Sequence, residues 1–456
     1  MKRTLAAVAA ACGGFLQGQD REYGAVSSDS RTLKTGDLFV AIRGPHYDGH
    51  DFLDACMREG AAGAVVSRPL AILLPQVVVK DTLDALAALA QAWRQQFAIP
   101  VVGVGGSNGK TTVKEMTAAI LGRLGPCLAT LGNLNNHIGV PLTLMRLEPV
   151  HRTAVIEMGA NRLGDVAALA AIARPTVGLI TNAGAEHLEG FGNLDGVAEG
   201  EGEMVASLDA SGTAVINADD DYAPLWQRMS NAGRTVTFGL GRDAQVRAVE
   251  IEQSVTAEGF ALRFELVAGG QRCPIQLRLA GRHNVINALA AAAAARAAGA
   301  SLEAIAAGLA TVRAVKGRLQ RIATPIGAWL IDDSYNANPS SLRAALELLH
   351  DLEGEKWLVL ADMGELGEYS QQSHVEAGAM ARASGVTRLF AAGPLSAHAA
   401  EAFGGGAEWF PDVEALIRRV AAELGPDTTV LIKGSRMNRL ERVVEALAAG
   451  PTAKAS

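Results

Sequence analysis

Short hydrophobic runs alternate with segments of helical spacing along most of the chain. Apolar strands are predicted at 101–104, 153–158, 177–182 and 213–217, and helical segments separate them. This alternation is typical of a wound α/β unit with a mostly parallel sheet. Between 235 and 280 the alternation is closer to period two, which predicts antiparallel strands there.

The two ends of the chain show the same alternation in smaller units. Strand-like runs at 37–42 and 76–80 flank a helix at 53–59, which predicts a small α/β domain. Beyond a stretch without periodicity near 313–319, strands and helices alternate again, as in a Rossmann-like fold. We therefore predict an α/β protein of three domains: a small amino-terminal domain at 1–82, a central P-loop ATPase-type domain with a parallel sheet at 83–313, and a Rossmann-like domain at 314–456.

Two alanine-rich segments need separate interpretation. The chain starts with MKRTLAAVAAACGGFL, which imitates a signal peptide, but Leu5, Val8, Cys12 and Phe15 recur at helical spacing. We predict a structural helix and a cytoplasmic protein. Six consecutive alanines at 290–295 predict a closely packed helix, because alanine is the best helix former.

Composition excludes several classes of protein. Hydrophobic residues make up 49% of the 456 residues and charged residues 20%, which is typical of a folded globular protein. No run of 18 strongly apolar residues is present to span a membrane. The net charge of −7 argues against nucleic-acid binding, which needs clustered Lys and Arg. The four cysteines lie too far apart for a typical metal motif.

The sharpest local signal is the run GGSNGKTT, which directly follows the strand at 101–104. Small residues let backbone N–H groups face a polyphosphate, Lys110 can reach its outer phosphates, and the Thr111 hydroxyl can bind Mg²⁺. Val104 stands where the strict Walker pattern has glycine, so this is a compact variant, GxxGKTT. The predicted nucleotide-binding residues here are Gly106, Ser107, Asn108, Gly109, Lys110, Thr111 and Thr112.

Two further residues follow predicted strands of the same sheet. Glu157 closes the strand at 153–158, and His187 lies five residues after Asn182. Ligands collect at the carboxyl ends of strands in open α/β sheets, so both side chains are expected near the γ-phosphate. A carboxylate suits Mg²⁺, whereas histidine is an unusual Mg²⁺ ligand and a hydrogen-bonding role is the alternative for it.

Seven motifs appear in order along the chain: GxxGKTT, GNLNNHIGVPLTL, EMGAN, HLEGFG, GRHNVINALAA, KGRL and DDSYNANPSS. With them the sequence resembles the Mur ligases of peptidoglycan synthesis over essentially its whole length. The resemblance implies an ATP- and Mg²⁺-dependent ligase whose domains bind, in order, the UDP-muramoyl peptide, ATP and the incoming amine. GNLNN with DSYNANP, and the absence of a DNPR signature, favour joining D-alanyl-D-alanine to UDP-N-acetylmuramoyl-tripeptide through an acyl phosphate. We expect a monomer.

The resemblance also implies roles for individual residues. Lys110, Glu157, His187, Arg318 and Asp333 would be catalytic, with His187 at a second metal position. Asn284 and Asn287 would lie near the adenine, with a polar helix start as the alternative. The other implied contacts are Asp333, Asn336 and Asn338 with ATP; Ser28, Arg31, Arg43, Asp48 and His50 with UDP, unless they only form a surface loop; Asn133, Asn135 and Asn136 with the muramoyl peptide; and Lys433, Ser435 and Arg436 with substrate in the closed state.

One position departs from the family pattern. Where sibling ligases have a lysine that is carbamylated, this chain has Glu201 in the run GVAEGEGEMV. A glutamate is already anionic but shorter, so we predict that Glu201 serves the metal through a water. The alternative is that Glu201 only solvates a helix face.

Two other functions stay open from the sequence. One is a different Mur-type or folylpolyglutamate-type ligase with the same ATP site. The other is a P-loop regulatory protein that binds nucleotide without ligating anything. Residues contributed by separate domains argue against a simple nucleotide sensor. The sequence leaves open whether the tripeptide ends in meso-diaminopimelate or lysine.

Overall fold

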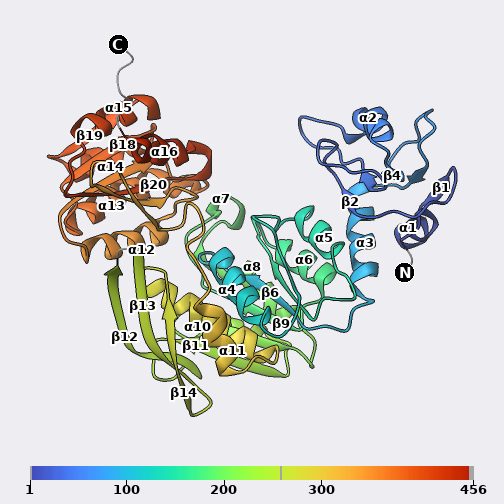
Figure 1. Cartoon of the computed structure of the whole chain (residues 1–456), viewed down its shortest axis with the longest axis horizontal. Helices are drawn as coiled ribbons and strands as arrows, with labels where there is room; N and C mark the ends of the chain where they lie inside the picture. The colour runs from blue at the N-terminus through green and yellow to red at the C-terminus, as the bar shows by residue number, and fades with distance from the viewer. Residues whose placement is uncertain (1–2, 257–258, 451–456) are drawn as a thin grey trace.

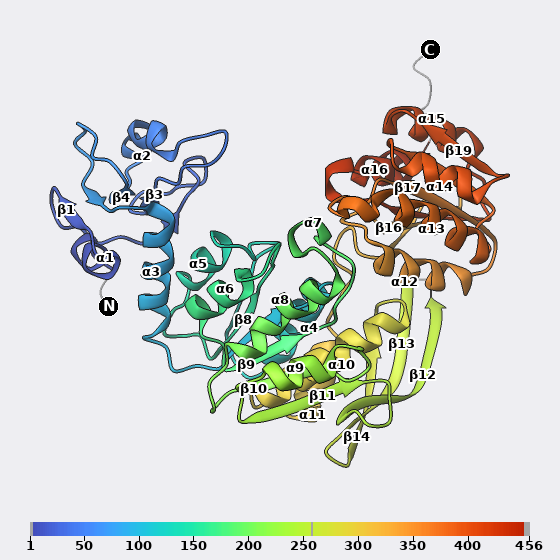
Figure 2. The ribbon, with the colours of Figure 1, turned by 180° about the vertical axis from the view of Figure 1, so that it is seen from behind.

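The computed structural model describes residues 3–256 and 259–450, and it consists of three α/β lobes (Figure 1). Each lobe is built on its own sheet, and the middle lobe lies between the other two in both views (Figures 1 and 2). The three sheets lie within the three predicted ranges, while the exact domain boundaries stay a prediction. None of the described helices combines the length and apolar character needed to cross a membrane.

The first lobe carries a five-stranded sheet in the order β1-β5-β4-β3-β2. Strands β2 to β5 pair in parallel and β1 pairs antiparallel to β5. The predicted starting helix is confirmed, although Phe15 lies beyond it in a strand and is 59% exposed. The elements are α1 Leu5–Cys12, β1 Phe15–Gln17, β2 Val26–Ser27, β3 Leu38–Val40, α2 Leu53–Arg58, β4 Gly63–Val66 and β5 Gln76–Val78.

Helix α3 (Thr82–Arg94) joins the first lobe to the middle one. It packs against α1 on one side and against α5 and α6 of the middle lobe on the other. Asp81 caps its start by accepting hydrogen bonds from Leu83 and Asp84 N–H. Near its end, Trp93 donates to the Leu147 carbonyl at 3.0 Å. The helix is therefore a packed connection rather than a loose linker.

The middle lobe has a nine-stranded sheet in the order β14-β13-β12-β11-β10-β9-β6-β8-β7. All neighbouring strands from β7 to β12 pair in parallel, and β13 and β14 add an antiparallel edge. The strands are β6 Val101–Gly105, β7 Cys127–Ala129, β8 Thr153–Glu157, β9 Val177–Ile180, β10 Thr213–Asn217, β11 Arg234–Gly239, β12 Val246–Thr256, β13 Gly259–Ala268 and β14 Gln271–Leu277.

The prediction of antiparallel pairing from residue 235 onward was wrong for β11, which is parallel to both neighbours. Val236 and Phe238 are buried while Thr235 and Thr237 are half-buried, so the alternation reports one well-covered face. The period-two pattern of β11 therefore marks a strand with one buried face and does not require an antiparallel partner.

The helices of the middle lobe cover its sheet. The predicted alanine-rich helix is confirmed as α10, and Ala290 to Ala295 are all buried. Their small side chains let α10 pack against both α4 and α11. The helices are α4 Lys110–Leu121, α5 Gly139–Leu144, α6 Asp165–Ala173, α7 Leu188–Phe191, α8 Leu194–Ala206, α9 Ala223–Met229, α10 Arg282–Ala297 and α11 Leu302–Leu309.

The third lobe has a six-stranded sheet in the order β15-β16-β20-β17-β18-β19, parallel except for β15. Phe260 of β13 joins its core, so the long β12–β13 hairpin reaches this lobe (Figure 1). The elements are β15 Gln320–Ala323, β16 Trp329–Asp333, α12 Pro339–His350, β17 Glu355–Ala361, α13 Ser370–Ala383, β18 Arg388–Ala392, α14 Ser396–Phe403, β19 Ala407–Phe410, α15 Val413–Glu423, β20 Thr428–Lys433 and α16 Glu441–Ala449.

Candidate active site

The loop at 106–109 carries the GxxGKTT motif, connects β6 to α4, and is named the phosphate loop here for its predicted ligand. Gly106 has a φ of +111°, and a Cβ there would lie 2.1 Å from Thr181 Oγ1, so only glycine fits. Asn182, which follows β9, binds the backbone of this loop through its side chain. Its Oδ1 accepts from Asn108 N–H and its Nδ2 donates to the Asn108 carbonyl, both at 3.0 Å. The loop is thus fixed by the neighbouring strand.

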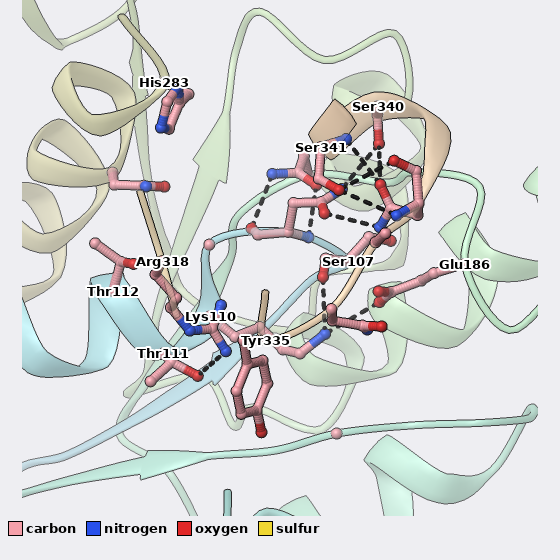
Figure 3. Close-up of a pocket in the computed structure, with 18 of the residues that line it drawn as sticks. Ser107, Lys110, Thr111, Thr112, Glu186, His283, Arg318, Tyr335, Ser340 and Ser341 are labelled. Atoms are coloured by element: carbon pink, nitrogen blue, oxygen red, sulfur yellow. Dashed lines mark hydrogen bonds and ion pairs between the residues drawn. The ribbon is translucent and has the colours of Figure 1, made fainter. Parts of the chain in front are cut away.

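Lys110 stands at the start of α4 and is surrounded by acceptors. Its Nζ donates to the carbonyls of Gly106 and Ser107 and to Glu186 Oε1, the last at 3.0 Å (Figure 3). Burial works against the charged ammonium, but Glu186, Glu201 and Glu157 outweigh it and raise the pKa of Lys110. Lys110 is therefore a cation at neutral pH.

Thr111 and Glu157 meet where β6 and β8 end. Thr111 Oγ1 donates to Glu157 Oε1 at 3.3 Å, and Asn135 Nδ2 donates to the same oxygen at 2.8 Å. Glu157 is 2% exposed, and its Oε2 has no hydrogen-bond partner among the described residues. A buried carboxylate oxygen beside a hydroxyl is the kind of oxygen set that Mg²⁺ prefers.

The third lobe reaches into the same place through three hydrogen bonds. Arg318 Nη2 donates to Thr111 Oγ1 at 3.0 Å, and its guanidinium lies over the Tyr335 ring, 4.4 Å from the centroid. Asn338, which caps α12, donates through Nδ2 to Asn108 Oδ1 at 2.9 Å. Asn108 Nδ2 in turn donates to Ser340 Oγ at 3.0 Å. Side chains of two lobes therefore meet on the phosphate loop (Figure 3).

Asp333 and Lys433 lie at the adjacent ends of β16 and β20. Lys433 is buried, forms an ion pair with Asp333, and donates to the Asn336 carbonyl at 3.1 Å. The pair therefore holds the loop that follows β16.

The first two turns of α10 bring amide side chains to the cavity. Asn287 Nδ2 donates to Asn284 Oδ1 at 3.0 Å, and Asn284 Nδ2 donates to the Ala280 carbonyl at 2.7 Å. A Cβ on Gly109 would lie 2.4 Å from Asn287 Oδ1, so the phosphate loop passes directly over this amide. Burial lowers the pKa of neighbouring His283 to about 4, which keeps its imidazole neutral.

These groups line one cavity of about 640 Å³ between the middle and third lobes (Figure 3). Its size suits a nucleotide or another ligand of that scale. The sequence-predicted residues on its wall are Ser107, Asn108, Gly109, Lys110, Thr111, Thr112, Asn133, Asn135, Asn136, Glu157, His187, Asn284, Asn287, Arg318, Asp333, Asn336, Asn338, Lys433 and Arg436.

Three predicted residues lie close to the cavity but off its wall. Gly106 donates through its N–H to Glu201 Oε2, beneath the loop. Ser435 Oγ accepts from Gly364 N–H at 2.7 Å. Glu201 is 1% exposed, and burial raises its pKa to about 7. The role of Glu201 toward a metal stays a prediction.

The predicted UDP contacts lie on the first lobe. His50 is 2% exposed; its Nδ1 pairs with Asp48 at 2.6 Å and its Nε2 accepts from Ser67 N–H at 2.9 Å. Asp48 and His50 thus hold their own loop together. Arg31 has an exposed side chain paired with Asp29. The structure does not bring these residues, nor Ser28 and Arg43, to the cavity, so contact with UDP stays a prediction.

His187 bridges two lobes. Its Nδ1 forms an ion pair with Glu365 of the third lobe at 2.8 Å. Both residues have left-handed backbones, with φ of +50° and +64°. Burial works against the imidazolium, but Glu365 and Glu186 outweigh it and raise the pKa of His187. The described residues contain no cluster of three or more His, Cys, Asp or Glu arranged to hold a metal, so the second metal position stays a prediction.

Sequence reasoning missed several cavity residues. Glu186 stands directly before the predicted His187, and Tyr335 and Ser340 lie inside the DDSYNANPSS motif. His283 begins the HNVIN run. Each lies within two residues of a predicted position, so the motifs mark the right segments. Only the packing of separate segments against one another selects these side chains.

Known proteins match the chain over its three lobes. Family models match at 22–94 (Mur ligase family, catalytic domain), 104–295 (Mur ligase middle domain) and 317–436 (Mur ligase, glutamate ligase domain). The UDP-N-acetylmuramoyl-tripeptide--D-alanyl-D-alanine ligase of Escherichia coli strain K12 is 45% identical over 95% of this chain and 96% of its own length.

Solved structures agree with this likeness. A crystal structure of MurF from Acinetobacter baumannii has a TM-score of 0.90 at 34% identity, covering 98% of this chain and 99% of that one. MurF from Thermotoga maritima, in complex with ADP, has a TM-score of 0.82 at 29% identity and covers 93% and 97%.

Proposed function

The chain belongs to the Mur ligase family, and we propose that it joins D-alanyl-D-alanine to UDP-N-acetylmuramoyl-tripeptide with consumption of ATP. The product is the UDP-N-acetylmuramoyl-pentapeptide used in peptidoglycan synthesis. One observation carries this function: Lys110 and Thr111, directly after the phosphate loop, share a cavity with Arg318 and Asn338 of the third lobe. An amide ligase needs residues of separate lobes around one cavity, because the phosphoryl group, the acid and the amine must come together there.

The reaction consists of two transfers. A terminal carboxylate oxygen of the tripeptide attacks the γ-phosphorus of ATP, and the bond between that phosphorus and the oxygen bridging it to the β-phosphate breaks. ADP departs, and the tripeptide becomes an acyl phosphate. The amine of D-alanyl-D-alanine, after losing a proton, then attacks the acyl carbon. The tetrahedral intermediate breaks its bond to the phosphate-bearing oxygen, which yields the amide and inorganic phosphate.

The chain's own residues contribute position and charge to these transfers. Lys110 stabilises negative charge on the phosphoryl oxygens, and Arg318 approaches the same region from the third lobe. Asn284 and Asn287 hold the adenine end of the nucleotide. Because no residue has to become covalently modified, the rate enhancement comes from alignment and preorganised charge.

A magnesium ion fits the donors at the base of the cavity. Glu157 Oε2 is buried with no hydrogen-bond partner among the described residues, and the Thr111 hydroxyl lies on the other oxygen of the same carboxylate. These two side chains would hold the ion together with phosphate oxygens and water. When bound, the ion would neutralise charge on the phosphates.

The rival functions fit the geometry less well. A nucleotide-binding regulator has no need for Arg318 of another lobe on Thr111, or for Asn338 on Asn108. A folylpolyglutamate-type ligase would share the ATP site, so only the substrates distinguish it.

Isotope transfer tests the proposed reaction. With ¹⁸O in the terminal carboxylate of UDP-N-acetylmuramoyl-tripeptide, one ¹⁸O should appear in the released phosphate for each amide formed. Mass spectrometry of phosphate and peptide measures both. Unlabelled phosphate alongside the pentapeptide product would reject the acyl phosphate.

A further inference from the structure

Glu186 shares the active-site cavity with Lys110, and the ligation scheme leaves it without a role. Glu186 Oε1 accepts from Lys110 Nζ at 3.0 Å (Figure 3). The two side chains are 11% and 15% exposed, so water and salt screen this charge pair only weakly. Glu186 comes from the segment between β9 and α7, whereas Lys110 begins α4.

All three hydrogen-bond donors of the Lys110 ammonium have partners. Two are the carbonyls of Gly106 and Ser107, which belong to the phosphate loop itself and remain beside Lys110 while the loop keeps its shape. The third is the Glu186 carboxylate. A phosphate oxygen can bind Lys110 only by replacing one of them. Glu186 is the partner on a separate segment, and it carries a charge that repels phosphate.

We propose that Glu186 competes with the outer phosphates of the nucleotide for Lys110. Its carboxylate occupies the third donor until a phosphate displaces it, and it recaptures Lys110 when ADP leaves. Glu186 is thus a positioning residue that acts through Lys110 and lowers the affinity for product. This inference rests on the proposed function, because it takes the ligand to be ATP or ADP.

The surroundings of the pair support this role. Glu157 and Glu201 add negative charge around Lys110, which therefore stays charged whether its partner is carboxylate or phosphate. His187, the residue after Glu186, is ion-paired with Glu365 of the third lobe. The segment that carries Glu186 is therefore held from across the cavity, and its carboxylate has a defined place beside Lys110.

Calorimetric titration with ADP, with and without Mg²⁺, tests the competition. Glu186→Gln keeps the shape of the side chain and removes its charge. Because it removes both an ion-pair partner and a like-charge repulsion, it should lower the Kd for ADP by about threefold to tenfold without Mg²⁺. Glu199→Gln is the matched control, since Glu199 is exposed on α8. Its Kd should equal that of the wild type.

A double-mutant cycle identifies Lys110 as the group through which Glu186 acts. In a Lys110→Ala background only the like-charge repulsion is left to remove, so Glu186→Gln should lower the Kd for ADP by a smaller factor than it does in the wild-type background. Glu186→Ala, which also removes the acceptor, should tighten ADP binding in the same direction as Glu186→Gln.

Several results would overturn the inference. Unchanged or weaker ADP binding by both Glu186 variants, at an unaltered melting temperature, would reject the competition. A loss of affinity confined to titrations with Mg²⁺ would show instead that Glu186 holds the metal. If the wild type binds no ADP, the proposed function fails together with this inference. If the wild type binds ADP and the Glu186 variants bind it with the same Kd, only the inference is rejected.

Discussion

Arg318 of the third lobe donates a hydrogen bond of 3.0 Å to Thr111 Oγ1, which lies directly after the phosphate loop of the middle lobe. Its guanidinium lies on the Tyr335 ring, and its Nε is buried with no hydrogen-bond partner among the described residues. An arginine held in this way can exchange the hydroxyl for a phosphate oxygen without moving its lobe. The contact therefore links the position of the third lobe to the chemistry at the loop.

Replacing Arg318 should affect turnover more than binding. Lysine keeps the charge but lacks the planar fork, so Arg318→Lys should lower kcat by about tenfold to a hundredfold. Steady-state phosphate release measures this, with Arg343→Lys, at an exposed position on α12, as the control. An Arg318→Lys enzyme with wild-type kcat would show that the fork is not used.

Lys110 should contribute more to the transition state than to ATP binding. Its ammonium lies among three carboxylates and remains charged, so it can follow the phosphoryl group as negative charge shifts. Lys110→Ala should lower kcat by at least about 10²-fold, the scale of one lost preorganised contact. If only KM changes, Lys110 merely holds the nucleotide.

Glu201 should make the enzyme independent of carbon dioxide, because a glutamate side chain already ends in a carboxyl group and cannot be carbamylated. Activity should be the same before and after bicarbonate depletion. Glu201→Gln then separates two roles. If Glu201 only holds the loop, Glu201→Gln should leave ADP binding and the Mg²⁺ requirement unchanged, because the amide oxygen of glutamine can still accept from Gly106 N–H. A higher Mg²⁺ requirement with unchanged metal-free ADP binding would assign Glu201 to the metal instead.

His283 should make stability depend on pH. Burial lowers its pKa to about 4, whereas an unfolded histidine has a pKa of about 6.5. As pH falls from about 6.5 to about 4, the unfolded chain takes up a proton that the folded chain does not, so stability decreases. In His283→Gln, the drop in melting temperature between about pH 7 and about pH 5 should be smaller. An equal drop in both proteins would contradict this.

The sequence identifies those parts of the site that lie on one segment. The phosphate loop follows from glycines between a strand and a lysine, and Glu157 follows from its place at a strand end. Contacts between segments are different. The Lys110–Glu186 pair and the burial of His50 depend on packing that no local pattern reports. The pairing of β11 was missed for the same reason, because its alternation is equally compatible with parallel neighbours.

The central claim is that this cavity ligates a dipeptide to a muramoyl tripeptide at the expense of ATP. The most direct test is phosphate release from ATP with each combination of UDP-N-acetylmuramoyl peptide and candidate amine. Release should require both UDP-N-acetylmuramoyl-tripeptide and D-alanyl-D-alanine, with one phosphate for each pentapeptide formed. Equal turnover with UDP-N-acetylmuramoyl-dipeptide and a single diamino acid would contradict the account.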